Sequence, residues 1–337
     1  MHLTRRAVVA SAALAAATPA LAKPRPIVIA HRGASGERPE HTPMAYRLAI
    51  DQGCDFIEPD LVLTRDGVLV VRHENEIGET TDLAARPEFA ARRTTKVIDG
   101  ERLEGWFAED FTLAELKTLR ARERLHELRP GSAKFDGREA IPTFQEVIDL
   151  AKAESRRVGR TIGVYPEMKH PAFLASQGLP IEARLADALK TNGLDSRTAP
   201  VFVQCFEAEP LKAFAKLSKA RRVQLVGGDA PQMVSAEGLK AIAGYADGVG
   251  PDWSLVLPTV EGALGPPTPL VAQAHALGLA VHPWTVRAEN RYLPPRLRRG
   301  AGVAEHGDAE ALCRALYAAG VDGLFSDFPA IAVAART

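Results

Sequence analysis

The sequence has few cysteines, no excess of either charge and no long apolar run. Its 337 residues include only three cysteines, Cys54, Cys205 and Cys313, and this odd, widely spaced set predicts no disulfide framework. We interpret them as small buried hydrophobic residues. No apolar run reaches the roughly 18 residues of a membrane span. The 42 basic and 42 acidic residues balance, which argues against nucleic acid as a partner because a phosphate-backbone binder carries a basic excess.

The first 22 residues have the pattern of an export signal peptide. Arg5 and Arg6 precede an apolar stretch that is too short to span a bilayer, and Ala-Leu-Ala at residues 20–22 fits a cleavage site. Paired arginines favour the twin-arginine route, although they also occur in ordinary signals. We therefore expect a mature chain of residues 23–337 with 40 basic and 42 acidic residues, a net charge of −2.

Short apolar runs alternate with helical patterns along the rest of the chain. Runs buried on both faces that alternate with amphipathic segments are typical of a parallel sheet with crossover helices. About eight such units in one domain fit an α/β fold closed into a (β/α)₈ TIM barrel better than an open sheet. The runs lie at residues 27–30, 56–63, 68–71, 161–165, 201–205, 223–226, 248–250, 280–286 and 323–326.

One segment interrupts this alternation. Between Glu74 and Gly137 no strand-like run is present, and charged and turn residues are dense. We expect a small insertion at about residues 74–111, after the second strand unit, on the face where barrel loops carry function. Threonine–glutamate capping boxes at residues 112–115 and 143–146 predict two helix starts.

Two histidines and an arginine follow predicted strands. His31 and Arg32 end the first run, where an imidazole can transfer a proton and a guanidinium can bind two oxygens of an anion. His73 follows the run at residues 68–71 in the same way. A His-Arg-Gly sequence by itself is weak support for a site, because it is common in ordinary loops.

Strand carboxylates indicate a cation site. Glu58 and Asp60 are two residues apart, so on a strand both point to the same side, where they repel unless a cation bridges them or each has its own basic partner. Glu167 and Lys169 repeat this spacing, either as a third oxygen ligand and a phosphate contact or as a plain ion pair. Three carboxylates without a Cys or His cluster favour Ca²⁺ or Mg²⁺ over zinc. Calcium is the more plentiful ion outside the cytoplasm.

Seven motifs, in order from about residue 27 to 330, resemble those of the glycerophosphodiester phosphodiesterases, especially the periplasmic, calcium-dependent bacterial branch. The resemblance implies a (β/α)₈ barrel with an insertion that hydrolyses glycerophosphodiesters to sn-glycerol 3-phosphate and an alcohol. The motifs are IAHRGASGERPEHT (29–42), CDFIEPDLVLTRDGVLVVRHENEI (54–77), IPTFQEVIDLA (141–151), IGVYPEMK (162–169), VFVQCFEAEPLK (201–212), VHPWTVRAEN (281–290) and VDGLFSDFP (321–329).

The resemblance also implies roles for individual residues. His31 and His73 resemble the catalytic acid–base pair, and Arg32 and Lys169 the phosphate contacts. Glu58, Asp60 and Glu167 resemble the metal ligands, and Trp284 resembles a wall of the substrate pocket. Phe206 and Phe328 either line the mouth of that pocket or pack in the core.

Two positions depart from the common family pattern. Many members have asparagine where this chain has His41, a difference that resembles the periplasmic branch. Many members also have aspartate where this chain has Glu74, so the group that orients His73 is unassigned.

Two other functions stay open. A phospholipase-type phosphodiesterase on the same fold needs an exposed apolar rim, for which Trp106 and Phe107 are candidates. A periplasmic solute-binding protein would hold small phosphodiesters without cleaving them and would not need two histidines beside three carboxylates. The sequence leaves open the preferred alcohol, the oligomeric state and which histidine is the acid. It also leaves open whether water or the glycerol 2-hydroxyl attacks phosphorus.

Overall fold

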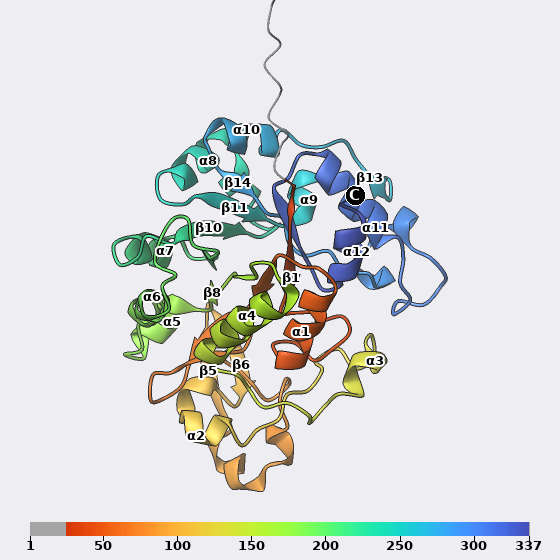
Figure 1. Ribbon diagram of the computed structural model, residues 1–337. Coiled ribbons are helices and arrows are strands. Elements are labelled where there is room, and N and C mark those ends of the chain that lie inside the picture. The colour runs from red at the N-terminus through yellow and green to blue at the C-terminus, as the bar shows by residue number, and fades with distance from the viewer. Residues whose placement is uncertain (1–24, 337) are drawn as a thin grey trace, which may run out of the picture.

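Parallel strands closed into a ring form the centre of the structure, a computed structural model that describes residues 25–336 (Figure 1). Neighbouring strands pair in parallel around the ring except between the last two, and β3 (Asp60–Leu63) and β8 (Glu167–Met168) continue the second and third strands beyond a break. Around the ring the strands are β1 (Ile27–His31), β2 (Phe56–Glu58), β7 (Gly163–Val164), β9 (Phe202–Cys205), β10 (Arg221–Val226), β11 (Gly248–Pro251), β14 (Ala280–Val281) and β15 (Gly323–Ser326).

The segment after β14 closes the ring against β15. The Val286 N–H donates to the Phe325 carbonyl at 2.8 Å, and the Phe325 N–H donates to the Pro283 carbonyl at 2.9 Å. Val286 also pairs in parallel with Ser326. These bonds join the two parallel sheets into one barrel and confirm the predicted (β/α)₈ fold.

Prolines interrupt two barrel strands where they leave the ring. Pro59 separates β2 from β3, and Pro166 lies between β7 and β8, because proline has no N–H to donate to a sheet. Beyond the breaks the strands pair again, with Asp60 opposite Glu167 and Glu167 opposite Gln204. This register brings three polar side chains together at the mouth of the barrel.

One predicted strand is not part of the ring. β4 (Leu69–Val71) runs antiparallel to β3, with Val62 opposite Val70, so the two form a hairpin that projects from the barrel. The prediction of a parallel barrel strand at residues 68–71 is therefore wrong. Both strands of the hairpin are buried and, apart from Asp60, apolar, and periodicity alone does not distinguish such a strand from a barrel strand.

The segment between β4 and α4 (Phe144–Val158) forms a layer outside the barrel with its own hydrophobic cluster. Leu83, Phe89, Phe111 and Leu119 pack in this cluster. The expectation of no strand in this segment is wrong, because two strands pair as an antiparallel hairpin. They are mostly exposed and rich in charge, and therefore lack the apolar run that marks a strand. The elements of the segment are η1 (Leu83–Ala85), η2 (Pro87–Arg92), β5 (Thr94–Ile98), β6 (Glu101–Gly105), η3 (Ala108–Asp110), α2 (Leu113–Leu116) and α3 (Pro130–Ala133).

Helices cover the outside of the barrel, and their apolar faces pack on the strands (Figure 1). The predicted capping boxes are present at Thr112, which starts α2, and at Thr143, which starts α4. The remaining elements are α1 (Pro43–Asp51), α5 (Pro171–Ser176), α6 (Ile181–Thr191), α7 (Ala208–Ala215), η4 (Pro231–Val234), α8 (Ala236–Ala243), α9 (Trp253–Val256), β12 (Thr259–Val260), β13 (Ala263–Leu264), α10 (Leu270–Ala276), η5 (Asn290–Tyr292), η6 (Pro295–Leu297), α11 (Ala309–Ala318) and α12 (Pro329–Ala334).

Burial agrees with the interpretation of the cysteines. Cys54, Cys205 and Cys313 are all buried free thiols. Within residues 25–336 no helix is long and apolar enough to cross a bilayer. The predicted signal peptide, residues 1–22, lies outside the described residues.

Candidate active site

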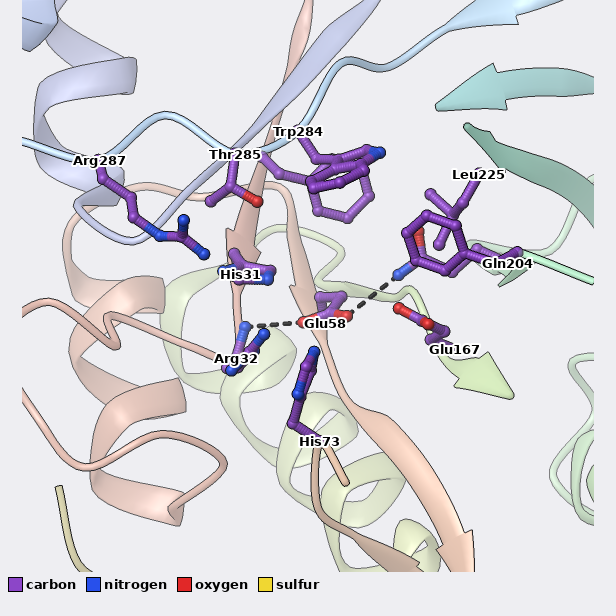
Figure 2. Close-up of a pocket in the computed structure, with 12 residues that line it drawn as sticks. His31, Arg32, Glu58, His73, Glu167, Gln204, Leu225, Trp284, Thr285 and Arg287 are labelled. Atoms are coloured by element: carbon purple, nitrogen blue, oxygen red, sulfur yellow. Dashed lines mark hydrogen bonds between the residues drawn. The ribbon is translucent and has the colours of Figure 1, made fainter. Parts of the chain in front are cut away.

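Most of the predicted site residues line one pocket at the mouth of the barrel (Figure 2). Seven of the ten residues for which the resemblance implied a role in the site line the pocket itself, and Asp60, Lys169 and Phe328 do not. Asp60 lies behind the pocket, with its Oδ2 atom 3.4 Å from Nε of Arg32. Lys169 lies beside the pocket and forms an ion pair with Glu167. The lining residues are His31, Arg32, Glu58, His73, Glu167, Gln204, Phe206, Leu225, Trp284, Thr285, Arg287 and Phe325.

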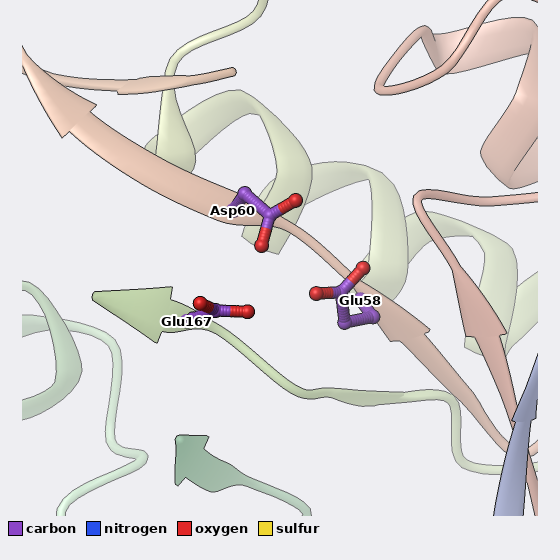
Figure 3. Close-up of side chains that lie close together, drawn as sticks. All are labelled: Glu58, Asp60 and Glu167. Atoms are coloured by element: carbon purple, nitrogen blue, oxygen red, sulfur yellow. The ribbon is translucent and has the colours of Figure 1, made fainter. Parts of the chain in front are cut away.

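Three buried carboxylates lie together on β2, β3 and β8 (Figure 3). One oxygen each from Glu58, Asp60 and Glu167 lies within 4.8 Å of the others. Burial and repulsion from Asp60 and Glu167 raise the pKa of Glu58 well above its usual range. Burial, aided by the charge of Asp60, also raises the pKa of Glu167 to about 8. The crowding of three acidic groups in a buried space is the electrostatic situation that a bound cation relieves.

The donor set of this triad fits a hard divalent ion. All three ligands are carboxylates, and Oδ1 of Asp60 is buried without a hydrogen-bond partner. Buried polar atoms are normally paired, so an unpaired oxygen on one of three crowded carboxylates is a place for a ligand. The residues present can therefore hold a metal ion.

The start of the first loop fixes Glu58. The Arg32 N–H donates to Oε2 of Glu58 at 2.7 Å, and the Gln204 amide donates to Oε1 at 3.0 Å. Arg32 adopts φ 59° and Gly33 φ 86°, so the chain turns sharply out of β1 and aims this N–H at the carboxylate. A Cβ on Gly33 would lie 2.7 Å from the backbone of Ala45, which explains the glycine at this position.

Asp60 is held by a buried histidine. Nε2 of His41 lies 2.9 Å from Oδ2 of Asp60, and Nδ1 of His41 lies 2.9 Å from the Tyr46 hydroxyl. Burial opposes ionisation of Asp60, but His73, His41 and Lys169 hold its pKa well below the usual range. His41, which the sequence left without a role, therefore supports the acidic triad from behind.

A carboxylate orients His31. Nδ1 of His31 lies 2.6 Å from Oδ1 of Asp327, while Arg129 and Arg287 donate to Oδ2 of the same aspartate at 2.5 and 3.0 Å. Burial would raise the pKa of Asp327, but the two guanidinium groups hold it well below its usual range. Burial and the Arg32 charge lower the pKa of His31 to about 4. The imidazole of His31 is therefore neutral, and its contact with Asp327 at Nδ1 sets the orientation of the ring.

Glu74 orients His73 and fills the role that the sequence left unassigned. Oε1 of Glu74 bonds Nδ1 of His73. Nε2 lies 3.3 Å from Nζ of Lys169, and because an ammonium group only donates, Nε2 accepts and Nδ1 carries the imidazole proton. Burial and the charges of Arg32 and Lys169 lower the pKa of His73 to about 3. Both histidines thus have a carboxylate at Nδ1.

A chain of ion pairs links the two sides of the site. Oε2 of Glu40 accepts from Arg32 at 2.9 Å, and Oε1 accepts from Arg124 at 2.8 Å. Arg124 also donates to Glu74 at 2.8 Å. Sequence reasoning missed Glu40, Arg124, Arg129 and Asp327. Asp327 could have been found from its position directly after the last predicted strand, where functional side chains of a barrel lie.

The opposite wall of the pocket is aromatic. The rings of Phe206 and Trp284 meet edge to face with their centroids 5.5 Å apart, and the indole N–H donates to the Gly250 carbonyl at 2.8 Å. Phe206 is 41% exposed, so its ring lies at the mouth rather than in the core. Phe328 is buried against the His306 ring and does not line the pocket.

Hydrolysis of a phosphate diester needs positive charge to neutralise the phosphoryl oxygens and side chains that transfer protons. The mouth of this barrel has cations in Arg32 and Lys169 and proton-transfer groups in His31 and His73. Fold and site together define a barrel phosphodiesterase. The chain belongs to the glycerophosphoryl diester phosphodiesterase family, whose model matches residues 31–331.

Known relatives agree with this assignment. The chain is 34% identical over 326 residues to glycerophosphodiester phosphodiesterase GDPD6 of Arabidopsis thaliana, covering 90% of this chain and 84% of the relative. It is 30% identical over 344 residues to the glycerophosphodiester phosphodiesterase of Haemophilus influenzae, covering 90% and 87%.

A solved structure supports the fold. An Oleispira antarctica phosphodiesterase in complex with the product sn-glycerol-3-phosphate superimposes with a TM-score of 0.63 at 23% identity, covering 92% of this chain and 96% of the other.

Proposed function

We propose that this protein hydrolyses glycerophosphodiesters to sn-glycerol 3-phosphate and an alcohol, using His31 and His73 as an acid–base pair. The observation that carries the proposal is the pair of imidazoles at one pocket, each with a carboxylate on Nδ1. A proton kept on Nδ1 leaves Nε2 as the atom that exchanges protons with the substrate. Family membership and relatives named for this activity support the substrate class.

The substrate is an anion that repels nucleophiles, so its charge must be neutralised first. Arg32 and Lys169 supply two cations at the pocket. A divalent ion on Glu58, Asp60 and Glu167 would polarise a phosphoryl oxygen and stabilise the charge that develops on it. One neutral histidine then takes the proton of the nucleophile, water or the glycerol 2-hydroxyl, at Nε2. The other must first bind a proton from solvent at its Nε2, which the bound phosphate anion favours, and it then gives that proton to the departing alkoxide.

Calcium is the ion that we propose for this site, with magnesium as the alternative. The support is the all-carboxylate donor set and the expected export of the chain to a calcium-rich compartment. Calorimetric titration of chelator-treated protein with Ca²⁺ and Mg²⁺ tests the choice. Tighter Mg²⁺ binding, or activity only with Mg²⁺, contradicts it.

We also propose export to the periplasm through the signal at residues 1–22, by the twin-arginine route. Mass spectrometry of protein from its native envelope should find an N-terminus at or near Lys23. Replacing Arg5 and Arg6 together with lysine should retain the precursor inside the cell. An intact cytoplasmic chain in unmodified cells contradicts export, and normal export of the lysine variant contradicts the route.

The two alternative functions have less support. Phe107 is fully buried and the Trp106 indole donates to the Phe89 carbonyl at 2.8 Å, so neither side chain offers the free apolar rim that a membrane phospholipase needs. A solute-binding protein has no use for two imidazoles held on carboxylates.

Release of sn-glycerol 3-phosphate from glycerophosphocholine and glycerophosphoethanolamine, with and without calcium, tests the proposal. We expect release that depends on the metal. Tight binding of both diesters without release would instead support the solute-binding function. Preferential cleavage of phosphatidylinositol or sphingomyelin vesicles would support the phospholipase.

A further inference from the structure

Two arginines from one short segment of the layer outside the barrel reach the carboxylates that orient the two histidines. Arg124 and Arg129 lie between α2 and α3, five residues apart. Arg129 is 6% exposed, and the side chain of Arg124 is 20% exposed. Neither lines the pocket, so both act on the site only through other residues.

Arg129 is bonded through every part of its guanidinium group. Nη2 donates to Asp327 at 2.5 Å, Nε donates to Glu289 at 2.6 Å, and Nη1 donates to the Ser35 carbonyl at 2.9 Å. The other oxygen of Asp327 holds Nδ1 of His31. Arg129 therefore fixes the position of the carboxylate from which His31 is oriented.

Arg124 makes the equivalent contact on the other side of the pocket. Both of its terminal nitrogens donate to Glu74, at 2.8 and 2.5 Å, as a fork on the carboxylate that holds Nδ1 of His73. One of them also donates to Glu40, which bonds Arg32. Arg124 therefore supports His73 through Glu74 and the phosphate contact through Glu40.

The same segment contains an arginine without such contacts. Arg122 forms a 3.6 Å ion pair with Asp136, with its side chain 40% exposed. It has the same charge and lies two residues from Arg124, but it reaches neither orienting carboxylate. Arg122 therefore provides a matched control.

Arginine suits both positions because its planar fork holds a carboxylate in one orientation and stays charged when buried. A lysine would keep the charge but could not hold Asp327, Glu289 and the Ser35 carbonyl in one plane. Without the guanidinium, Asp327 would lose its main buried counter-ion, and the imidazole that it orients would lose its fixed direction.

We propose that Arg124 and Arg129 are positioning residues, and that this segment completes the active site by fixing Glu74 and Asp327, and through them His73 and His31. The inference rests on the proposed function, since it takes the two histidines as the proton-transfer groups.

Steady-state turnover of glycerophosphocholine by full-length variants tests the proposal. Arg129→Met should lower kcat by about 10- to 100-fold, the usual effect of losing a residue that orients a functional histidine. It should leave KM within about twofold, because Arg129 does not touch the pocket. Arg124→Met should lower kcat similarly and also raise KM, since Glu40 bonds Arg32. Arg122→Met should match the wild type.

Double variants show whether each arginine acts through its carboxylate. Adding Arg129→Met to Asp327→Asn should lower kcat no further. Adding Arg124→Met to Glu74→Gln should also lower kcat no further, although KM should still rise because Arg124 bonds Glu40. The crossed pair, Arg124→Met with Asp327→Asn, should instead multiply the two losses. Multiplied losses within a pair, or wild-type kcat in folded single variants, overturn the proposal.

A measurement without turnover covers variants of low stability. The Nδ1 protons of His31 and His73, held against carboxylates, should give downfield proton resonances that are selectively lost in Arg129→Lys and Arg124→Lys, respectively. Retention of both resonances in folded lysine variants refutes the positioning role. If the wild type binds glycerophosphocholine but never cleaves it, the proposed function fails. If the wild type cleaves it and the folded arginine variants cleave it equally well, only the positioning role of the arginines fails.

Discussion

Replacing Asp327 with asparagine should place the proton of His31 on the wrong nitrogen. Oδ2 of Asp327 accepts hydrogen bonds from Arg129 and Arg287, whereas Oδ1 faces Nδ1 of His31 at 2.6 Å. An asparagine must turn its only oxygen towards the two arginines, so its NH₂ group faces Nδ1. The ring then accepts at Nδ1 and carries its proton on Nε2, the nitrogen that Asp327 does not contact.

The expected loss follows from that change of tautomer. A general acid or base contributes about 10² to 10⁴ in rate, which is about 3–5 kcal/mol of activation free energy at about 1.36 kcal/mol per decade. We expect kcat for glycerophosphocholine to fall within this range, with calcium affinity unchanged because Asp327 is not part of the acidic triad.

A matched control comes from an aspartate–histidine pair outside the site. Asp322 lies 2.8 Å from Nε2 of His275, and both side chains are about one-third exposed. Asp322→Asn makes the same chemical change and should leave turnover unaltered. Nitrogen-15 spectra of labelled histidine report the tautomer directly. Turnover within about threefold of wild type by a folded Asp327→Asn protein whose His31 carries its proton on Nε2 would refute the reasoning.

Glu58→Gln removes one charge from the acidic triad and places an amide opposite the hydrogen-bond donors of Arg32 and Gln204. It should therefore weaken calcium binding and activity together, with partial rescue at high calcium. Activity that responds neither to chelator nor to this substitution rules out the metal site. His31→Ala and His73→Ala should each lower turnover by about 10² to 10⁴ while calcium still binds, and near wild-type turnover in either removes that histidine from the mechanism. Burial lowers the pKa of His282 to about 4, so between about pH 6.5 and 4 this group binds more protons in the unfolded chain than in the folded one, and it alone should lower the free energy of unfolding by up to about 3 kcal/mol as the pH falls across that window. Denaturant unfolding at pH 7 and 4.5 should show a smaller fall in His282→Asn, and an equal fall in both proteins contradicts the assignment.

The sequence was sufficient for the barrel and for the residues that meet at its mouth. His31 and Arg32 end a strand, and the two-residue spacing of Glu58 and Asp60 places both carboxylates on one side, so local periodicity predicts where these side chains go. The pairing of Asp60 with Glu167 required only that the strands be parallel neighbours.

The support for these side chains could not be predicted in the same way. Asp327 lies 296 residues from His31, and the Arg124 fork crosses 50 residues to reach Glu74. Such contacts depend on how the outer layer folds over the barrel, and no local pattern encodes that. The hairpin of β3 and β4 could not be predicted for a related reason, because a buried strand has the same sequence pattern whether it lies in the barrel or beside it.

The ion pairs of the segment between β4 and α4 limit how this enzyme can be re-engineered. Loops at the mouth of a (β/α)₈ barrel are the usual places to shorten, exchange or graft when a new specificity is wanted. Here a deletion that removed residues 124–129 would take Arg124 from Glu74 and Arg129 from both Glu289 and Asp327, although Asp327 would keep Arg287. Removing one partner of a buried ion pair typically costs about 3–5 kcal/mol. A barrel in which this segment is shortened or exchanged would therefore lose stability whatever its new specificity, unless the replacement segment supplies basic side chains to pair with these carboxylates.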